Sequence, residues 1–142
     1  MAVKDYISIS KISTDRDPSA LEREGKGYMA WKDDALAALF HNGTPMKFIA
    51  FLEFKNGVSR GNHYHRTQRQ YLLVVAGDLR SKFILPDAPD DVLELTLTQG
   101  DLLYCEPGCV HSYQAVDSSL AIEYSPELYE VDDMVPYPVE WP

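Results

Sequence analysis

The sequence has no basic residue beyond Lys82, so its charge is distributed very unevenly. Residues 1–82 contain all 13 lysines and arginines together with nine acidic residues, whereas residues 83–142 contain 13 acidic residues. The formal net charge is −9. Proteins that bind DNA or RNA present a basic surface to the phosphates, so this balance argues against a nucleic-acid polymer as a partner.

Long apolar runs are also missing. No segment approaches the roughly 20 apolar residues that cross a bilayer. The N-terminal segment MAVKDYISIS lacks the basic region and apolar core of a secretory signal. We therefore expect a cytoplasmic protein with no membrane partner.

Cysteine is scarce. The two cysteines, Cys105 and Cys109, have a C-x3-C spacing that would supply half of a four-ligand zinc site. We interpret them as ordinary, partly buried thiols, because free cysteines are usually buried.

The length of 142 residues and the hydrophobic content of 45% predict one domain with a core. We divide this single domain into an N-terminal extension (1–45), a barrel (46–125) and an extended tail (126–142). Within the extension, Thr14–Ser19 is typical of a loop and Ala35–Phe40 predicts a short helix.

From Met46 onward the chain consists of short apolar runs, rich in β-branched and aromatic residues and separated by Gly, Pro, Asn and Asp. In one run Leu93, Leu95 and Leu97 alternate with polar residues, the period of a strand with one buried face. The predicted strands are Phe48–Phe54, Gln70–Val75, Arg80–Leu85, Val92–Thr98, Leu102–Cys105, Ser112–Ala115 and Ala121–Tyr124. This spacing, without long helices, predicts an all-β antiparallel sandwich or barrel such as a jelly roll.

Three of the four histidines lie in two motif-like segments. His63 and His65 project to one face of an extended chain, so both imidazoles can converge on one ion or one substrate. His111 follows a Gly-Asp turn, a short strand and a Pro-Gly turn, which bring a third imidazole from a distant part of the sequence. Gln70 could complete the site as a neutral oxygen ligand, or it could hydrogen-bond to an imidazole and fix its tautomer.

We expect a divalent metal ion at this site, with His63, His65, Gln70 and His111 as ligands, and no organic cofactor. Imidazole-rich ligation is compatible with Zn, Ni, Mn and Fe. The glutamine contributes no charge, which weakens the electrostatic hold on a cation.

Two further residues are candidates for substrate chemistry. Arg60 can bind a phosphate or carboxylate through its planar guanidinium, or it can be a solvent-exposed strand residue. Together with Arg66 and Arg69 it makes this region the expected place for a small anionic substrate. Tyr113 shares a face with His111 and could pass a proton, although packing inside a barrel explains it equally well.

At these residues the sequence resembles the cupin superfamily. The first cupin motif has the form G-x5-H-x-H-x3,4-E-x6-G, and the second has the form G-x5-P-x-G-x2-H. The first is matched at His63, His65 and Gly77, with Gln70 in place of the usual Glu. The second is matched at Gly100, Pro107, Gly108 and His111, although no residue separates the proline from the glycine. The resemblance implies a double-stranded β-helix, the cupin jelly-roll barrel, with a site in its mouth.

A narrower resemblance is to cupins that act on nucleotide-linked sugars. Arg60-Gly61-x-His63 is similar to the Arg-Gly-x-His of deoxysugar 3,5-epimerases, in which the histidine is the base and the arginine contacts the substrate. Segment 60–65 is similar to the zinc-binding cupin half of capsular-polysaccharide enzymes. Sugar 3,4-ketoisomerases share Arg-Gly-x-His-x-His, a glutamine at position 70 and an acidic aromatic tail like residues 127–133, but their early Arg-Gly turn is missing here.

The resemblance implies a homodimeric isomerase or epimerase that moves a proton next to a carbonyl of a sugar or nucleotide-linked sugar. The expected catalytic residues are His63, His65 and Tyr113, with Arg60 on the substrate. A bound ion would act as a Lewis acid; without one, either histidine of the pair would remove the proton. A non-catalytic ligand-binding cupin and an iron-dependent dioxygenase are the alternative functions.

Overall fold

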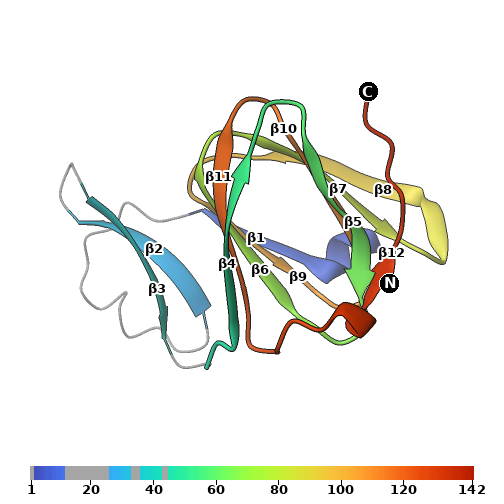
Figure 1. Cartoon of the computed structure of the whole chain (residues 1–142), viewed down its shortest axis with the longest axis horizontal. Coiled ribbons are helices and arrows are strands. Elements are labelled where there is room, and N and C mark those ends of the chain that lie inside the picture. Colours follow the sequence, from blue (N-terminus) through green and yellow to red (C-terminus); the bar gives the residue numbers. More distant parts are fainter. Residues whose placement is uncertain (1, 12–25, 33–35, 43–44) are drawn as a thin grey trace.

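The computed structural model describes residues 2–11, 26–32, 36–42 and 45–142. The described residues form strands and two short 3-10 helices, which confirms the all-β class (Figure 1). None of the helices in these ranges is long and apolar enough to span a membrane. The elements in chain order are η1 (Val3–Tyr6), β1 (Ile7–Lys11), β2 (Lys26–Lys32), β3 (Leu36–Asn42), β4 (Phe48–Phe54), β5 (Ser59–His65), β6 (Gln70–Ala76), β7 (Leu79–Leu85), β8 (Ala88–Leu97), β9 (Asp101–Cys105), β10 (Val110–Ala115), β11 (Ser119–Ser125), η3 (Val131–Asp133) and β12 (Met134–Pro136).

Two five-stranded antiparallel sheets make up the barrel. The first has the order β1-β9-β6-β11-β4, and the second has the order β12-β5-β10-β7-β8. Strands β4 to β7 alternate between the sheets, and so do β8 to β11 after the β7–β8 hairpin, which is the jelly-roll connectivity. The sheets face each other in Figure 1. Between them lies an apolar core in which Phe54, Leu72, Phe83 and Leu103 are fully buried.

All seven predicted strands are present, and β4 has the predicted bounds. β8 begins at Ala88, earlier than predicted, because Ala88 already pairs with Leu85 across a turn at Pro86 and Asp87. β1, β5 and β12 were not predicted as strands. β5 is polar and β12 has three residues, so no apolar run marks them, whereas Ile7 and Ile9 of β1 do alternate with serines and this short period-two signal was missed.

The predicted helix over Ala35–Phe40 is wrong, because residues 36–42 form β3. β3 pairs antiparallel with β2, with Phe40 opposite Tyr28. A short apolar run has no periodicity that separates a helix from a strand, so the available pairing partner decides. The predicted loop over Thr14–Ser19 lies outside the described residues.

The C-terminal segment lies along the strand that carries the histidine pair. In β12, Met134 pairs with His65 and Pro136 pairs with His63, so β5 is an inner strand of its sheet rather than an edge (Figure 1). Further along, the Trp141 indole donates a 2.8 Å hydrogen bond to the Ser112 hydroxyl on β10. The tail therefore contacts both histidine-bearing strands, β5 along its edge and β10 at Ser112.

Candidate functional site

Neighbouring strands β5 and β10 carry five of the six predicted site residues, all except Gln70. His63 pairs with His111, and Arg60 pairs with Tyr113. A β-bulge separates the two pairs, with Asn62 in the left-handed region at φ 58. Residues 60 and 63 of a regular strand would point to opposite faces. The bulge inserts one residue, so both Arg60 and His63 line the same cavity.

Gly61 makes this bulge possible. Its φ is 92, in the left-handed region that favours glycine. A Cβ at this position would also collide with the carbonyl oxygen of His111. Glycine is therefore required where the two histidine-bearing strands approach each other.

The three histidines form one cluster. Their ligand atoms lie within 4.8 Å of one another, and Nε2 of His63 is 3.2 Å from Nε2 of His111. The two motifs are also tied by a 2.8 Å backbone hydrogen bond from Gly108 to the His65 carbonyl. The structure thus brings together the histidines of both motifs, as the spacing predicted.

The Nδ1 atoms of the three imidazoles approach oxygens outside the cluster. The pairs are His63 with the Gly61 carbonyl (2.8 Å), His111 with the Cys109 carbonyl (3.3 Å) and His65 with the Asp133 carboxylate (3.4 Å). An acceptor at Nδ1 favours the tautomer that carries the proton there, and in that tautomer Nε2 keeps its lone pair. Both ring nitrogens of His65 are buried, and neither makes a hydrogen bond of good geometry within the described residues, so the 3.4 Å approach to Asp133 is a close polar contact.

Burial lowers the pKa of all three imidazoles. It lowers the pKa of His63 to about 4, helped by the neighbouring His65. The pKa of His111 falls for the same reason, and that of His65 falls although Asp133 acts in the opposite direction. Neutral imidazoles are the form that binds metals or accepts a proton.

These features fit a divalent metal ion. The ligand atoms of three neutral imidazoles lie close together, and oxygen atoms outside the cluster orient the three rings through Nδ1. Gln70, the fourth predicted ligand, is buried on β6 and lines the adjacent cavity. Its Oε1 has no partner within the described ranges, while its amide donates to Glu123. Metal ligation by the four residues stays a prediction.

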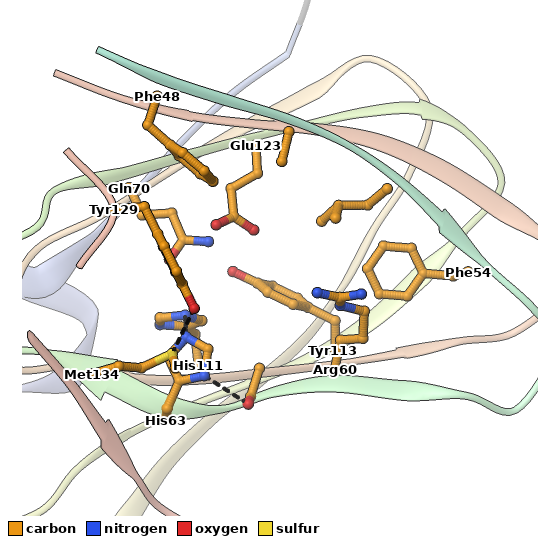
Figure 2. Close-up of a pocket in the computed structure, with 13 residues that line it drawn as sticks. Phe48, Phe54, Arg60, His63, Gln70, His111, Tyr113, Glu123, Tyr129 and Met134 are labelled. Carbon is orange, nitrogen blue, oxygen red and sulfur yellow. Dashed lines mark hydrogen bonds between the residues drawn. The ribbon is translucent and has the colours of Figure 1, made fainter. Parts of the chain in front are cut away.

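Beside the cluster lies a cavity of about 160 Å³. Figure 2 shows its polar side chains, among them Arg60, His63, Tyr113 and Glu123. His65 is not among the lining residues, so His63 rather than His65 can meet a ligand. The side chains that β4 adds are apolar: Phe48, Ala50, Leu52 and Phe54.

The arginines near the histidine pair do not all face the cavity, although all three were expected near the substrate. Arg60 lines the cavity and is exposed to solvent. Arg69 forms a 2.6 Å ion pair with Glu127, and Arg66 donates to the Asp132 carbonyl at 2.7 Å. Two of the three arginines are therefore engaged with the tail, and Arg60 is the one that faces the cavity.

The cysteines are free and buried more deeply than predicted, with 1% exposure each. Cys105 and Cys109 lie under His111: the Cys109 carbonyl faces the His111 ring, and the Cys105 thiol is 4.0 Å from His111 Nδ1. The metal-ligand cluster found within the described residues consists of the three histidines and contains no cysteine.

Two acidic residues at the site were missed from the sequence. Glu123 lies on β11 and lines the cavity; burial raises its pKa to about 7, while Arg60 and the Gln70 amide act against this rise. In the sequence Glu123 alternates with Ile122 and Tyr124, a pattern that predicts a solvent-facing glutamate. It faces inward because the apolar residues of β11 belong to a second cluster on the outer face of the first sheet.

Asp133 comes from the tail and holds the loop between β5 and β6. It accepts hydrogen bonds from the Thr67 amide and hydroxyl, both at 2.8 Å, and from the Gln68 amide at 3.0 Å. Burial acts to raise its pKa, but these hydrogen bonds and the nearby His65 together lower it. Its only signal in the sequence was the acidic tail, which does not reveal its partner.

The cupin family model matches residues 15–125. No curated protein matches the chain. Among solved structures, dTDP-4-dehydrorhamnose 3,5-epimerase from Sulfolobus tokodaii is 21% identical with a TM-score of 0.60, over 69% of this chain and 63% of the epimerase. The chain thus spans less than two thirds of that enzyme.

Two other solved structures have a similar fold. The 3,4-ketoisomerase QdtA from Thermoanaerobacterium thermosaccharolyticum, in complex with TDP, is 15% identical with a TM-score of 0.69, over 92% of this chain and 87% of QdtA. The capsular polysaccharide assembling protein CapF from Staphylococcus aureus is 20% identical with a TM-score of 0.62, over 80% of this chain and 33% of CapF. At these identities the likeness shows the fold alone.

Proposed function

The chain belongs to the cupin family, and on this premise we propose that it is an isomerase or epimerase that acts on a sugar or nucleotide-linked sugar by moving a proton next to a carbonyl. The observation that carries the proposal is the presence of a neutral imidazole and a protonated phenol on one wall of a small cavity. These groups are His63 and Tyr113. The names of similar structures, an epimerase and a 3,4-ketoisomerase, support the same reaction class.

In the reaction without a metal ion, His63 is the base. Its Nδ1 is held by the Gly61 carbonyl, so Nε2 has the lone pair that can take a proton from the carbon beside a carbonyl. The electron pair left behind forms an enediolate. Tyr113 stays protonated because burial raises its pKa, so it can protonate or hydrogen-bond the enediolate oxygen. Isomerisation results when His63 returns the proton to the neighbouring carbon, whose oxygen keeps the proton from Tyr113, while the other enediol hydroxyl gives its proton back to Tyr113. Epimerisation results when a proton reaches the original carbon from the opposite face instead.

In the alternative, His63, His65, His111 and Gln70 would hold a divalent ion. Such an ion supplies Lewis-acid polarisation of a carbonyl or enediol oxygen when bound. With His63 committed as a ligand, the proton-carrying side chains left on the cavity wall include Tyr113 and Glu123. Elemental analysis of protein purified without a His tag separates the two versions, because only the second requires stoichiometric metal.

The substrate is proposed to be small and anionic, with Arg60 as its cationic contact. Arg60 is exposed at the cavity and pairs across the strands with Tyr113, so a phosphate bound to it would lie beside the reacting groups.

The function is tested by incubating the protein with TDP-4-keto-6-deoxyglucose in deuterated water and following the protons next to the carbonyl by NMR. We expect deuterium to enter the sugar. In the version without metal, His63→Asn should slow this exchange by roughly 10²- to 10⁴-fold, the usual contribution of a general base. Absence of exchange with this and related 4-keto sugars would refute the proposed reaction, and oxygen uptake on ligand addition would favour a dioxygenase instead.

A further inference from the structure

Three polar groups at one side of the cavity have unfilled hydrogen-bonding capacity. Oε1 of Gln70 and the hydroxyl of Tyr113 have no partner among the described residues, and both side chains are at most 3% exposed. The carboxylate of Glu123 takes the Gln70 amide, which leaves further lone pairs free. Figure 2 shows the three groups directed toward a common space. They come from β6, β10 and β11, and thus from both sheets.

Buried polar groups in native proteins are nearly always paired, so unpaired ones call for a bound molecule or a function. Here two acceptors, Glu123 and Gln70, stand beside one hydroxyl, Tyr113, that can donate. Hydroxyl groups of a ligand can donate to the first two and accept from the third. Phosphate oxygens have few protons to donate near neutral pH, so a phosphate could not satisfy both acceptors.

The cavity size limits what can reach these groups. Its volume of about 160 Å³ is well below the ~300–1,000 Å³ of pockets that enclose drug-sized ligands. It suits one ring rather than a whole nucleotide-linked sugar. Phe48, Leu52 and Phe54 add apolar surface to the lining, on which the C–H groups of a sugar ring can pack.

We propose that Glu123, together with Gln70 and Tyr113, is the recognition site for the hydroxyl groups of a single polyhydroxylated ring, with Glu123 as the main acceptor. This inference rests on the proposed function and deepens it, because it names the part of a sugar-like ligand that the cavity holds. Glu123 is then a specificity residue. The anionic part of the ligand remains outside the ring site, toward Arg60.

The test follows the Glu123 carboxyl carbon by NMR in the full chain labelled with ¹³C at glutamate carboxyls, assigned with Glu123→Gln. Three probes are added: 6-deoxyglucose, TDP-glucose and TDP. We expect the Glu123 signal to move with both sugar-bearing probes and not with TDP. A signal that moves with TDP alone, or with none of the probes, overturns the proposal. The readout is made on the unaltered chain, so it does not depend on the folding of a variant.

Calorimetry gives the energetic counterpart. Glu123→Gln should raise the Kd for TDP-glucose by roughly 10- to 100-fold, because one of the two acceptor oxygens becomes an NH₂ group that cannot accept a hydrogen bond from a ligand hydroxyl, and leave the Kd for TDP unchanged. The matched control is Glu53→Gln, an exposed glutamate on the neighbouring strand β4, which should change neither. Equal binding of TDP-glucose by both variants would refute the role of Glu123. If the sugar probes move the Glu123 signal but no deuterium exchange occurs, the ring site stands and the proposed reaction fails.

Discussion

Asp133 is expected to set the tautomer of His65, and replacing it with asparagine tests this. Oδ1 of Asp133 accepts both hydrogen bonds from Thr67, while Oδ2 accepts the Gln68 amide and lies 3.4 Å from Nδ1 of His65. An asparagine at this position can keep the bonds from Thr67, but its NH₂ group would then face two donors. These donors are the Gln68 amide and the Nδ1–H group of His65. The hydrogen bond from Gln68 is lost, and the repulsion between the NH₂ group and His65 is relieved only when the His65 proton moves from Nδ1 to Nε2.

The stability loss follows from the lost bond to a charged acceptor, which contributes about 1.5–3 kcal/mol. For a chain of this size the melting temperature should fall by roughly 4–10 °C. The larger consequence is at the cluster, where a protonated Nε2 can no longer ligate an ion or accept a proton. Loss of such an outer partner typically lowers metal affinity about 10- to 100-fold.

The assay is long-range ¹H–¹⁵N NMR of the histidine rings, in which the two tautomers differ. The wild-type His65 should be protonated at Nδ1, and Asp133→Asn should shift the proton to Nε2. Asp132→Asn is the matched control, because Asp132 is exposed and contacts Arg66 through its backbone carbonyl. An Asp133→Asn variant with unchanged His65 signals and unchanged melting temperature would refute the role assigned to Asp133.

Three further predictions concern the histidine cluster. Because the pKa of His63 falls from 6.5 to about 4 on folding, the unfolded chain binds more protons between these values, so the melting temperature should decrease as pH falls from 7 to 4. His63→Gln should weaken that dependence, and an unchanged profile would count against the burial of a neutral imidazole. Gly61→Ala should lower the free energy of unfolding by more than about 1 kcal/mol in denaturant and shift the His63 and His111 ring signals. The reason is that φ of Gly61 is positive and the new Cβ meets the His111 carbonyl. Gly57→Ala is the control, because a Cβ there meets no atom within 4 Å, and it should leave those ring signals unchanged. If the cluster holds metal, chelation should lower the melting temperature and re-addition should restore it, whereas a chelator-insensitive, metal-free protein would favour the version without an ion.

Prediction from the sequence was most successful where a pattern repeats or where residue types are chemically specific. The strands from Phe48 onward carry apolar runs bounded by turn residues, so their positions followed from the sequence. The convergence of His63, His65 and His111 followed from two motifs, because alternate residues of an extended chain share a face and the turns before His111 bring in a third imidazole. The polar strand β5 and the three-residue strand β12 have no such signal, because their backbone partners and not their side chains make them strands.

The failures have a common physical cause, which is that a sequence pattern does not contain the partner of a segment. The run at residues 36–40 is apolar and short, and its pairing with β2 makes it a strand. Arg66 and Arg69 were expected near the ligand, but both contact the tail instead. Arg66 donates a hydrogen bond to the Asp132 carbonyl, and Arg69 forms an ion pair with Glu127. These contacts join residues more than 50 positions apart.

The sequence by itself determined the all-β architecture and the histidine cluster, because these follow from alternating apolar runs and from chemically specific motifs. Only the tertiary structure decided which groups share the cavity. Regular alternation along β5 would place Arg60 and His63 on opposite faces, but the bulge at Asn62 brings them to the same face. Alternation along β11 would expose Glu123, but the apolar cluster on the outer face of the first sheet turns it inward. Side-chain direction depends on bulges and on which face is covered, and both are properties of the assembled sheets.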